Sequence, residues 1–183
     1  PTCFSVTGQP AYCPVNYDGS FHGPVTLRAS LANSYNIPAV KMLYLNTVED
    51  MVASASAFGI DTFSDPKNYG LSLTLGGGEV RMTDIAEAFG VFANGGIRKD
   101  LVSILSVTDR YGQVLEEFKD PNRDKVIPSQ LLIQGDRAVS AETAFLISHI
   151  LSDNNARMAA FGSHSALEIP GHTVSVKTGT TDD

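Results

Sequence analysis

The residue types best suited to chemistry form a Lys-Thr-Gly-Thr string near the end of the chain: Lys177, Thr178, Gly179 and Thr180. Residues 172–177 alternate in the manner of a β-strand, in which side chains two apart lie on one face. Thr178 and Thr180 would therefore share a face, and Gly179 would leave the strand edge open to a ligand. An ammonium, two hydroxyls and an exposed edge backbone suit a carboxylate-bearing peptide that binds as an extra strand. The plain alternative is a surface strand that ends in a Thr/Gly turn.

A second candidate is the sequence Ser34-Tyr35-Asn36, which lies between two predicted helices. Serine beside a helix is more often a cap than a proton relay, so this signal is weak when taken alone. The same Ser-x-Asn spelling recurs in residues 152–154, at the end of another predicted helix, where Asp and Asn commonly form caps and turns. We predict that this second copy is structural.

Composition and spacing argue against several other kinds of function. The net charge of −7 disfavours nucleic acid, because the phosphate backbone attracts clustered Lys and Arg. The four histidines lack metal-ligand spacing, and Val176 stands where a phosphate-binding loop over residues 171–178 would need a glycine. The sequence also holds no run of about 18 apolar residues and no signal-peptide pattern. We expect a soluble chain that uses no metal or cofactor and binds no nucleic acid.

A mainly helical fold must position these candidates. With 43% hydrophobic and 18% charged residues, the 183-residue chain can bury the core of one domain. Five helices are predicted, at about residues 26–33, 38–45, 47–59, 83–93 and 140–152. Four of them begin with a Thr or Ser cap, and the second begins at Pro38. Three strands are predicted, at residues 101–108, 113–118 and 172–177. The turn at residues 109–112 joins the first two strands into a hairpin.

This order of elements predicts an α+β fold in which a helical cluster faces an antiparallel sheet. Residues 1–24, rich in Gly, Pro, Tyr and Asn, predict an irregular lead-in segment, and residues 25–183 form the predicted domain. Cys3 and Cys13 lie in the lead-in, ten positions apart. They could form a disulfide outside the cytoplasm or remain two free thiols, and the sequence leaves both open.

The chain resembles the transpeptidase domain of bifunctional, class A penicillin-binding proteins. Residues 21–28 and 31–41 match the region around the family's Ser-x-Asn motif, and residues 69–80 match the family's Gly-rich segment. Residues 92–96 match the helix end that follows, and residues 177–181 match the third catalytic motif. The segments occur in the family's order. The similarity extends from about Asn16 to the last residue, with Ser34 and Lys177 lying 143 positions apart.

The resemblance implies the transpeptidase fold shared by penicillin-binding proteins and serine β-lactamases. It also implies a peptidoglycan D,D-transpeptidase that cross-links stem peptides ending in D-Ala-D-Ala through an acyl-serine intermediate, which β-lactam antibiotics trap. Such enzymes act on the extracytoplasmic face of the bacterial cell membrane. The class further implies a membrane anchor and a glycosyltransferase domain elsewhere in the parent protein.

The resemblance also implies a catalytic or binding role for each motif residue. The Ser34 hydroxyl would bridge Lys177 and the lysine of the family's first motif, and pass a proton to the leaving group. Asn36 would bind that first-motif lysine or the amide of the donor peptide. Thr178 and Thr180, with Gly179 between them, would hold the substrate carboxylate. The backbone N–H of Thr180 would supply half of the oxyanion hole.

The family's first motif, Ser-x-x-Lys, provides the nucleophile and its base. Its literal match here, residues 64–67, follows Ser34 in a polar turn, whereas the family's nucleophile precedes Ser-x-Asn by several tens of residues and starts a buried helix. We therefore expect the 64–67 match to be false and the nucleophilic serine to lie upstream of Pro1. The fold would then be incomplete at both ends, and the chain inactive alone.

Three alternatives remain open from the sequence. A serine β-lactamase shares these motifs, although the Glu-x-x-Leu-Asn string of the class A type follows neither Ser-x-Asn copy. A non-catalytic module of the same fold could sense β-lactams or bind the cell wall. The chain could also be an inert fragment, because a partial sheet leaves an unpaired edge and an incomplete core.

Overall fold

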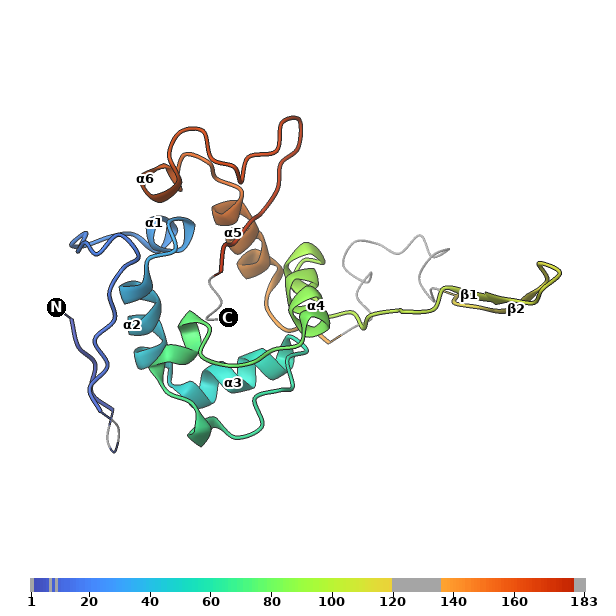
Figure 1. The fold of residues 1–183 in the computed structure, drawn as a ribbon, viewed down its shortest axis with the longest axis horizontal. Coiled ribbons are helices and arrows are strands. Elements are labelled where there is room, and N and C mark those ends of the chain that lie inside the picture. Colours follow the sequence, from blue (N-terminus) through green and yellow to red (C-terminus); the bar gives the residue numbers. More distant parts are fainter. Residues whose placement is uncertain (1, 7, 9, 120–135, 180–183) are drawn as a thin grey trace.

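The computed structural model describes residues 2–6, 8, 10–119 and 136–179. Six α-helices, two 3₁₀ helices and two strands make up its regular structure, in chain order: α1 (Leu27–Ala32), α2 (Asn36–Asn46), α3 (Val48–Ala57), η1 (Pro66–Asn68), η2 (Leu71–Leu75), α4 (Met82–Ala93), β1 (Ser106–Thr108), β2 (Val114–Glu117), α5 (Ala141–Leu151) and α6 (Met158–Phe161). Helices with a small antiparallel sheet confirm the predicted α+β class (Figure 1). No helix in these ranges has the length and apolar character needed to cross a membrane.

Side-chain caps begin three helices where the sequence predicts them. Thr26, Thr47 and Ser140 precede α1, α3 and α5, and each hydroxyl accepts a hydrogen bond from the backbone N–H three residues on, at 3.2, 3.2 and 3.1 Å. A cap of this kind satisfies an N–H group that has no partner inside the helix. These three bonds therefore fix the starts of α1, α3 and α5.

Two predicted helix starts are wrong. Helix α2 begins at Asn36 rather than at Pro38, and Asn36 and Ile37 form its first turn before the proline. Helix α4 begins after Arg81, and Thr83 lies inside it, with its hydroxyl directed to Asp84 Oδ1 at 3.2 Å. Arg81 Nε holds the same buried carboxylate at 3.0 Å, so an ion pair takes the place of the expected Thr cap at this helix start.

The helices form a ring around the region that holds the candidate site. Helix α5 lies between α1 and α4, and α2 and α3 complete the ring on the opposite side (Figure 1). The main core joins the lead-in to α2, α3 and η2 through six buried side chains: Phe4, Val40, Leu43, Val52, Leu71 and Leu73. Burying a side chain of this size contributes about 1.5–3 kcal/mol. Val91 of α4 and Ala144 of α5 are also fully buried and join those two helices.

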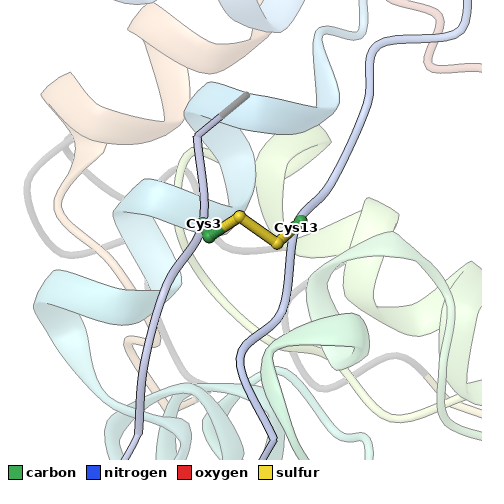
Figure 2. Close-up of a disulfide and its surroundings, with 2 residues drawn as sticks. All are labelled: Cys3 and Cys13. Atoms are coloured by element: carbon green, nitrogen blue, oxygen red, sulfur yellow. A yellow bond between two sulfur atoms is a disulfide. The ribbon is translucent and has the colours of Figure 1, made fainter.

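The lead-in segment is bound to the helices rather than trailing from them. Cys3 and Cys13 form a disulfide, the alternative that the sequence left open against free thiols (Figure 2). Next to the disulfide, Phe4 and Tyr12 exchange two backbone hydrogen bonds of 2.8 Å each. Because Phe4 belongs to the main core, this closed loop fixes the start of the described chain against α2.

The sheet consists of the hairpin β1–β2, which extends away from the helices (Figure 1). Its turn is the predicted one: Asp109 Oδ1 accepts the N–H groups of Tyr111 and Gln113 at 2.8 and 2.9 Å. The expected strand over residues 172–177 is wrong for this chain. A strand requires a paired neighbour, and here the backbone N–H of Val176 binds instead the carbonyl of Leu151, at the end of α5.

Candidate active site

The structure brings Ser34 and Lys177 into direct contact. Lys177 Nζ donates a hydrogen bond to Ser34 Oγ at 2.7 Å, across 143 positions of sequence. Ser34 lies in the short turn between α1 and α2, where its backbone has a φ of 57°. Left-handed backbone is costly for a residue with a Cβ, so this turn is held in an unusual shape. The two motifs that the sequence singled out therefore meet at one place.

A large cavity lies beside this contact. It has a volume of about 850 Å³, and Ser34, Asn36 and Lys177 all line it. Most of the remaining lining is apolar and comes from α1, α2, α3 and α5, as with Leu31 and Ile147. An apolar hollow with a few convergent polar groups is the usual form of a binding site. In the described residues no cluster of His, Cys, Asp or Glu could hold a metal.

The position of Lys177 depends on the end of α5. Ser175 Oγ donates to the Ser148 carbonyl at 2.8 Å, and Val176 N donates to the Leu151 carbonyl at 3.1 Å. Both acceptors lie in the last turns of the helix, where carbonyl groups have no partner within the helix or point outward. The segment before Lys177 therefore uses helix carbonyls in place of a neighbouring strand.

Lys177 is half-buried at the wall of the cavity. Burial lowers the pKa of the Lys177 ammonium below its ordinary value, because the charged form loses hydration. Its nitrogen compensates with two hydrogen bonds, to Ser34 Oγ and to the Thr178 carbonyl at 2.8 Å. A lysine with a lowered pKa gives up its proton more readily than an exposed lysine, which suits proton transfer.

The other predicted residues lie around the same cavity to different extents. Asn36 lines it, and its amide Nδ2 donates to the Val15 carbonyl of the lead-in at 2.9 Å. Thr178 contributes its carbonyl to Lys177. Among the described residues, a Cβ added to Gly179 would meet nothing within 4 Å, so the space around it is open to this part of the chain. Thr180 lies outside the residues that the structure describes.

The other motif matches and the Gly-rich segment lie in turns and at a helix end. Residues 64–67 form a polar turn in which Asp65 Oδ1 accepts the Lys67 N–H at 3.0 Å and begins η1. Ser152 caps the end of α5, and Ser152 and Asn154 line a smaller hollow of about 360 Å³. The glycines at 76–78 form a tight turn, since a Cβ on Gly78 would lie 2.6 Å from the ring of Phe63. None of these segments is part of the lining of the large cavity.

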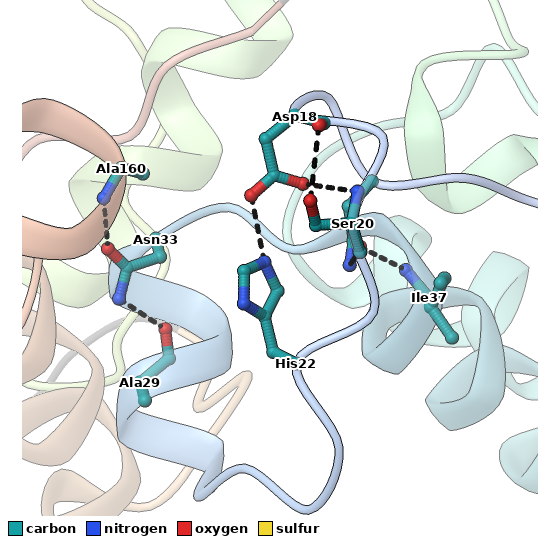
Figure 3. Close-up of polar contacts among 8 residues, drawn as sticks. Asp18, Ser20, His22, Ala29, Asn33, Ile37 and Ala160 are labelled. Atoms are coloured by element: carbon teal, nitrogen blue, oxygen red, sulfur yellow. Dashed lines mark hydrogen bonds and ion pairs between the residues drawn. The ribbon is translucent and has the colours of Figure 1, made fainter.

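Two buried asparagines beside the Ser34 turn were not predicted. Asn16 and Asn33 are each 5% exposed, and their amides bind backbone groups on either side of the turn. Figure 3 shows the bonds of Asn33 to Ala29 and Ala160. Neither belongs to a motif that carries chemistry, and side chain to backbone bonds between distant segments leave no pattern in a single sequence. Only their burial could have marked them.

Comparison with known proteins agrees with this geometry. The family model of the penicillin-binding protein transpeptidase domain matches residues 5–182. Penicillin-binding protein 1A of Rickettsia bellii is 28% identical over 96% of this chain, and that of Clostridium acetobutylicum is 30% identical over 94%. This chain spans 23% and 19% of those two proteins, about a fifth of their length.

Solved structures show the same fold. The crystal structure of penicillin-binding protein 1A from Haemophilus influenzae matches with a TM-score of 0.64 at 25% identity, over 85% of this chain and 25% of that one. Penicillin-binding protein A from M. tuberculosis, solved as an imipenem acyl-enzyme complex, matches with a TM-score of 0.69 at 20% identity, over 98% of this chain and 42% of that one. The predicted resemblance is confirmed: the chain belongs to the penicillin-binding protein transpeptidase family, as a transpeptidase domain of the class A type.

Proposed function

We propose that this chain forms two walls of the active site of a peptidoglycan D,D-transpeptidase. The enzyme cross-links stem peptides in bacterial cell-wall synthesis through an acyl-serine intermediate, and β-lactams acylate the same serine. The observation that carries the proposal is the 2.7 Å contact between Lys177 Nζ and Ser34 Oγ beside an apolar cavity. Family membership supports it, because the relatives are named for penicillin binding.

The contact gives the Ser34 hydroxyl a defined direction. A hydroxyl has one proton to donate and two lone pairs to accept with. Because Lys177 donates to Ser34 Oγ, the oxygen acts as the acceptor in that bond, and its own proton is available to another partner. In the proposed reaction that partner is the nitrogen of the departing D-alanine. Ser34 hands its proton to this nitrogen and is reprotonated from the lysines on either side of it.

The bonds made and broken follow from this proton path. The catalytic serine attacks the carbonyl of the penultimate D-alanine, and its proton passes to the lysine of the Ser-x-x-Lys motif. The C–N bond to the terminal D-alanine breaks, and that residue leaves as a free amine. An amine of a neighbouring stem peptide then attacks the acyl-serine, forms the cross-link and releases the serine, which recovers a proton.

The remaining predicted residues bind the donor peptide in this proposal. Asn36 binds the first-motif lysine or the donor amide, and Thr178 and Thr180 hold the terminal carboxylate. The open space at Gly179 supports this, since a peptide can approach the backbone there without meeting a side chain. The N–H of Thr180 forms half of the oxyanion hole, an interaction worth about 3 kcal/mol in the barrier to acylation.

The nucleophile belongs to an upstream part of the same protein in our proposal. This chain spans about a fifth of its relatives, and its match to Ser-x-x-Lys, residues 64–67, is a structural turn. We propose that the upstream part brings its serine and lysine to the large cavity, and that the chain is inactive without it. The parent protein would then act outside the cytoplasmic membrane, with an anchor and a glycosyltransferase domain elsewhere in its sequence.

The test uses the full-length protein and a fluorescent penicillin. We expect Lys177→Ala to abolish labelling, and Lys67→Ala, the lysine of the false motif, to leave it unchanged. Labelling of Lys177→Ala at the wild-type rate would refute the role of Lys177. A parallel assay for cross-linked peptide and released D-alanine identifies the reaction, because a β-lactamase would destroy penicillin without cross-linking and a sensor would form the acyl-enzyme alone.

A further inference from the structure

The turn that carries Ser34 holds a backbone shape that its own sequence does not favour. Ser34 and Thr47 are the non-glycine residues with positive φ in the described part of the chain, and Thr47 is accounted for as a helix cap. Serine in the left-handed region persists only where the surroundings fix it. The residues that fix it are those that bind the backbone immediately before and after the turn.

On one side, Asn33 joins the end of α1 to a distant loop. Its Nδ2 donates to the Ala29 carbonyl at 2.9 Å, and its Oδ1 accepts the N–H of Ala160 at 2.8 Å (Figure 3). The same Nδ2 also donates to the Ala156 carbonyl at 2.7 Å. The side chain is 5% exposed. Both amide protons and the oxygen are thus used, which leaves the residue directly before Ser34 very little freedom to rotate.

On the other side, Asn16 holds the first turn of α2. Its Oδ1 accepts the N–H of Ile37 at 3.2 Å, and its Nδ2 donates to the Ser20 carbonyl at 2.8 Å. The loop that carries Asn16 is itself braced, because Asp18 accepts the Ser20 N–H and pairs with His22 at 2.8 Å (Figure 3). The N–H of Ile37 would otherwise lack a partner at the start of the helix.

We propose that Asn33 and Asn16 are positioning residues that hold the Ser34 hydroxyl at Lys177. This proposal rests on the proposed function, since it concerns the residue that would pass the proton. Neither asparagine lines the large cavity, and both act through the backbone of the turn. Asn33 ties the turn to residues 156–160, and Lys177 is tied to α5 just before them. One side chain therefore sets the spacing between the two halves of the site.

A purely structural role makes a different prediction. If Asn33 only satisfies buried backbone groups, its loss lowers stability but slows acylation no more than any other equally destabilising change. If it positions Ser34, its loss slows acylation in proportion to the misplacement of that hydroxyl, and the effect disappears once Ser34 has no hydroxyl to misplace. A double-mutant cycle separates the two cases, because only coupled residues depart from additivity.

The experiment measures the rate constant for acylation by fluorescent penicillin in the full-length protein. Asn33→Ala should slow acylation about tenfold or more with a small change in penicillin affinity, and Asn16→Ala should slow it less. In the Ser34→Ala background, either change should alter the remaining rate by less than about twofold. Val91→Ala is the control, because it leaves a cavity in α4, outside the site. This variant should be less stable than wild type but should keep the wild-type acylation rate.

Two results would overturn the positioning role. One is wild-type acylation by Asn33→Ala; the other is an equal loss with and without the Ser34 hydroxyl. If Asn33→Ala folds too poorly, Asn16→Ala decides by the same criteria, and a crystal structure of either variant should show Ser34 Oγ beyond 3.5 Å from Lys177 Nζ. Failure of the proposed function looks different, because the wild-type protein would then not be labelled, or Lys177→Ala would still be.

Discussion

The spelling Ser-x-Asn occurs twice in this chain, in two settings that differ in backbone and in partners. Ser34 has a φ of 57°, lies between two helices and accepts a hydrogen bond from Lys177, 143 positions away. Ser152 ends α5 with a φ of −95° and donates its hydroxyl to the His149 carbonyl of its own helix at 3.2 Å. The first serine is oriented by a remote residue, and the second by its local helix.

The residues that follow the two serines also differ in what they contact. Asp153 forms an ion pair with Arg28 at 3.1 Å and accepts the Ala156 N–H at 3.0 Å, which fastens the end of α5 to α1. Asn36 instead lines the large cavity. A three-residue motif therefore indicates chemistry only when the fold turns its hydroxyl toward a second functional group. The second copy joins the end of α5 to α1, the helix that precedes Ser34.

The largest expected effect comes from removing each serine hydroxyl in turn. In the full-length protein, Ser34→Ala should slow acylation by fluorescent penicillin about 100-fold or more, because a positioned proton donor is lost. Ser152→Ala should leave the rate within about twofold, since a helix-end hydroxyl bond contributes little beyond local stability. Equal losses at the two positions would mean that the contact with Lys177 has no special importance.

The titration of Lys177, the partner of Ser34, should determine how the acylation rate depends on pH. A charged Lys177 donates to Ser34, and burial lowers the pKa of Lys177 from its ordinary 10.5. The rate should therefore fall as pH rises through this lowered pKa, before an exposed lysine would lose its proton. Lys177→Arg should move that alkaline limb to higher pH, because arginine stays charged above about pH 12. If the alkaline fall in rate occurs at the same pH in Lys177→Arg and wild type, another group is responsible for it.

The smallest expected effect concerns Asp153 in the second copy. Its pKa lies below the ordinary value because the Ala156 N–H and the Arg28 guanidinium favour the carboxylate. The associated stability is therefore present above pH 3.8 and is lost as pH falls through the lowered pKa. Asp153→Asn should cost about 0.5–1 kcal/mol at neutral pH, the range for a partly exposed ion pair. Thermal unfolding at pH 7 and pH 3 checks this: the stability difference between variant and wild type should be smaller at pH 3 than at pH 7.

Local signals explain why much of the helical framework could be predicted. Thr26, Thr47 and Ser140 act as caps because each needs only its own hydroxyl and an N–H three residues on. The hairpin turn was also readable, since Asp109 and Gly112 determine it within four residues. The start of α4 was missed because Asp84 pairs there with Arg81, a side-chain choice that competes with the Thr cap.

Contacts between distant segments were harder to read. The pairing of Ser34 with Lys177 followed from resemblance to a family, and no periodicity or spacing would have given it. The strand expected before Lys177 failed because pairing depends on a neighbour, and in the described chain the Val176 N–H binds a helix end. Asn16 and Asn33 were missed for the same reason: their partners lie in other parts of the fold.

The separation of Ser34 and Lys177 along the chain also has a consequence for biosynthesis. At about 5–20 residues per second, a ribosome adds Lys177 roughly 7 to 30 seconds after Ser34. Until then α1 and α2 lack the lysine that faces them across the cavity. The two halves of the site can therefore meet only after nearly all of the described chain has been synthesised.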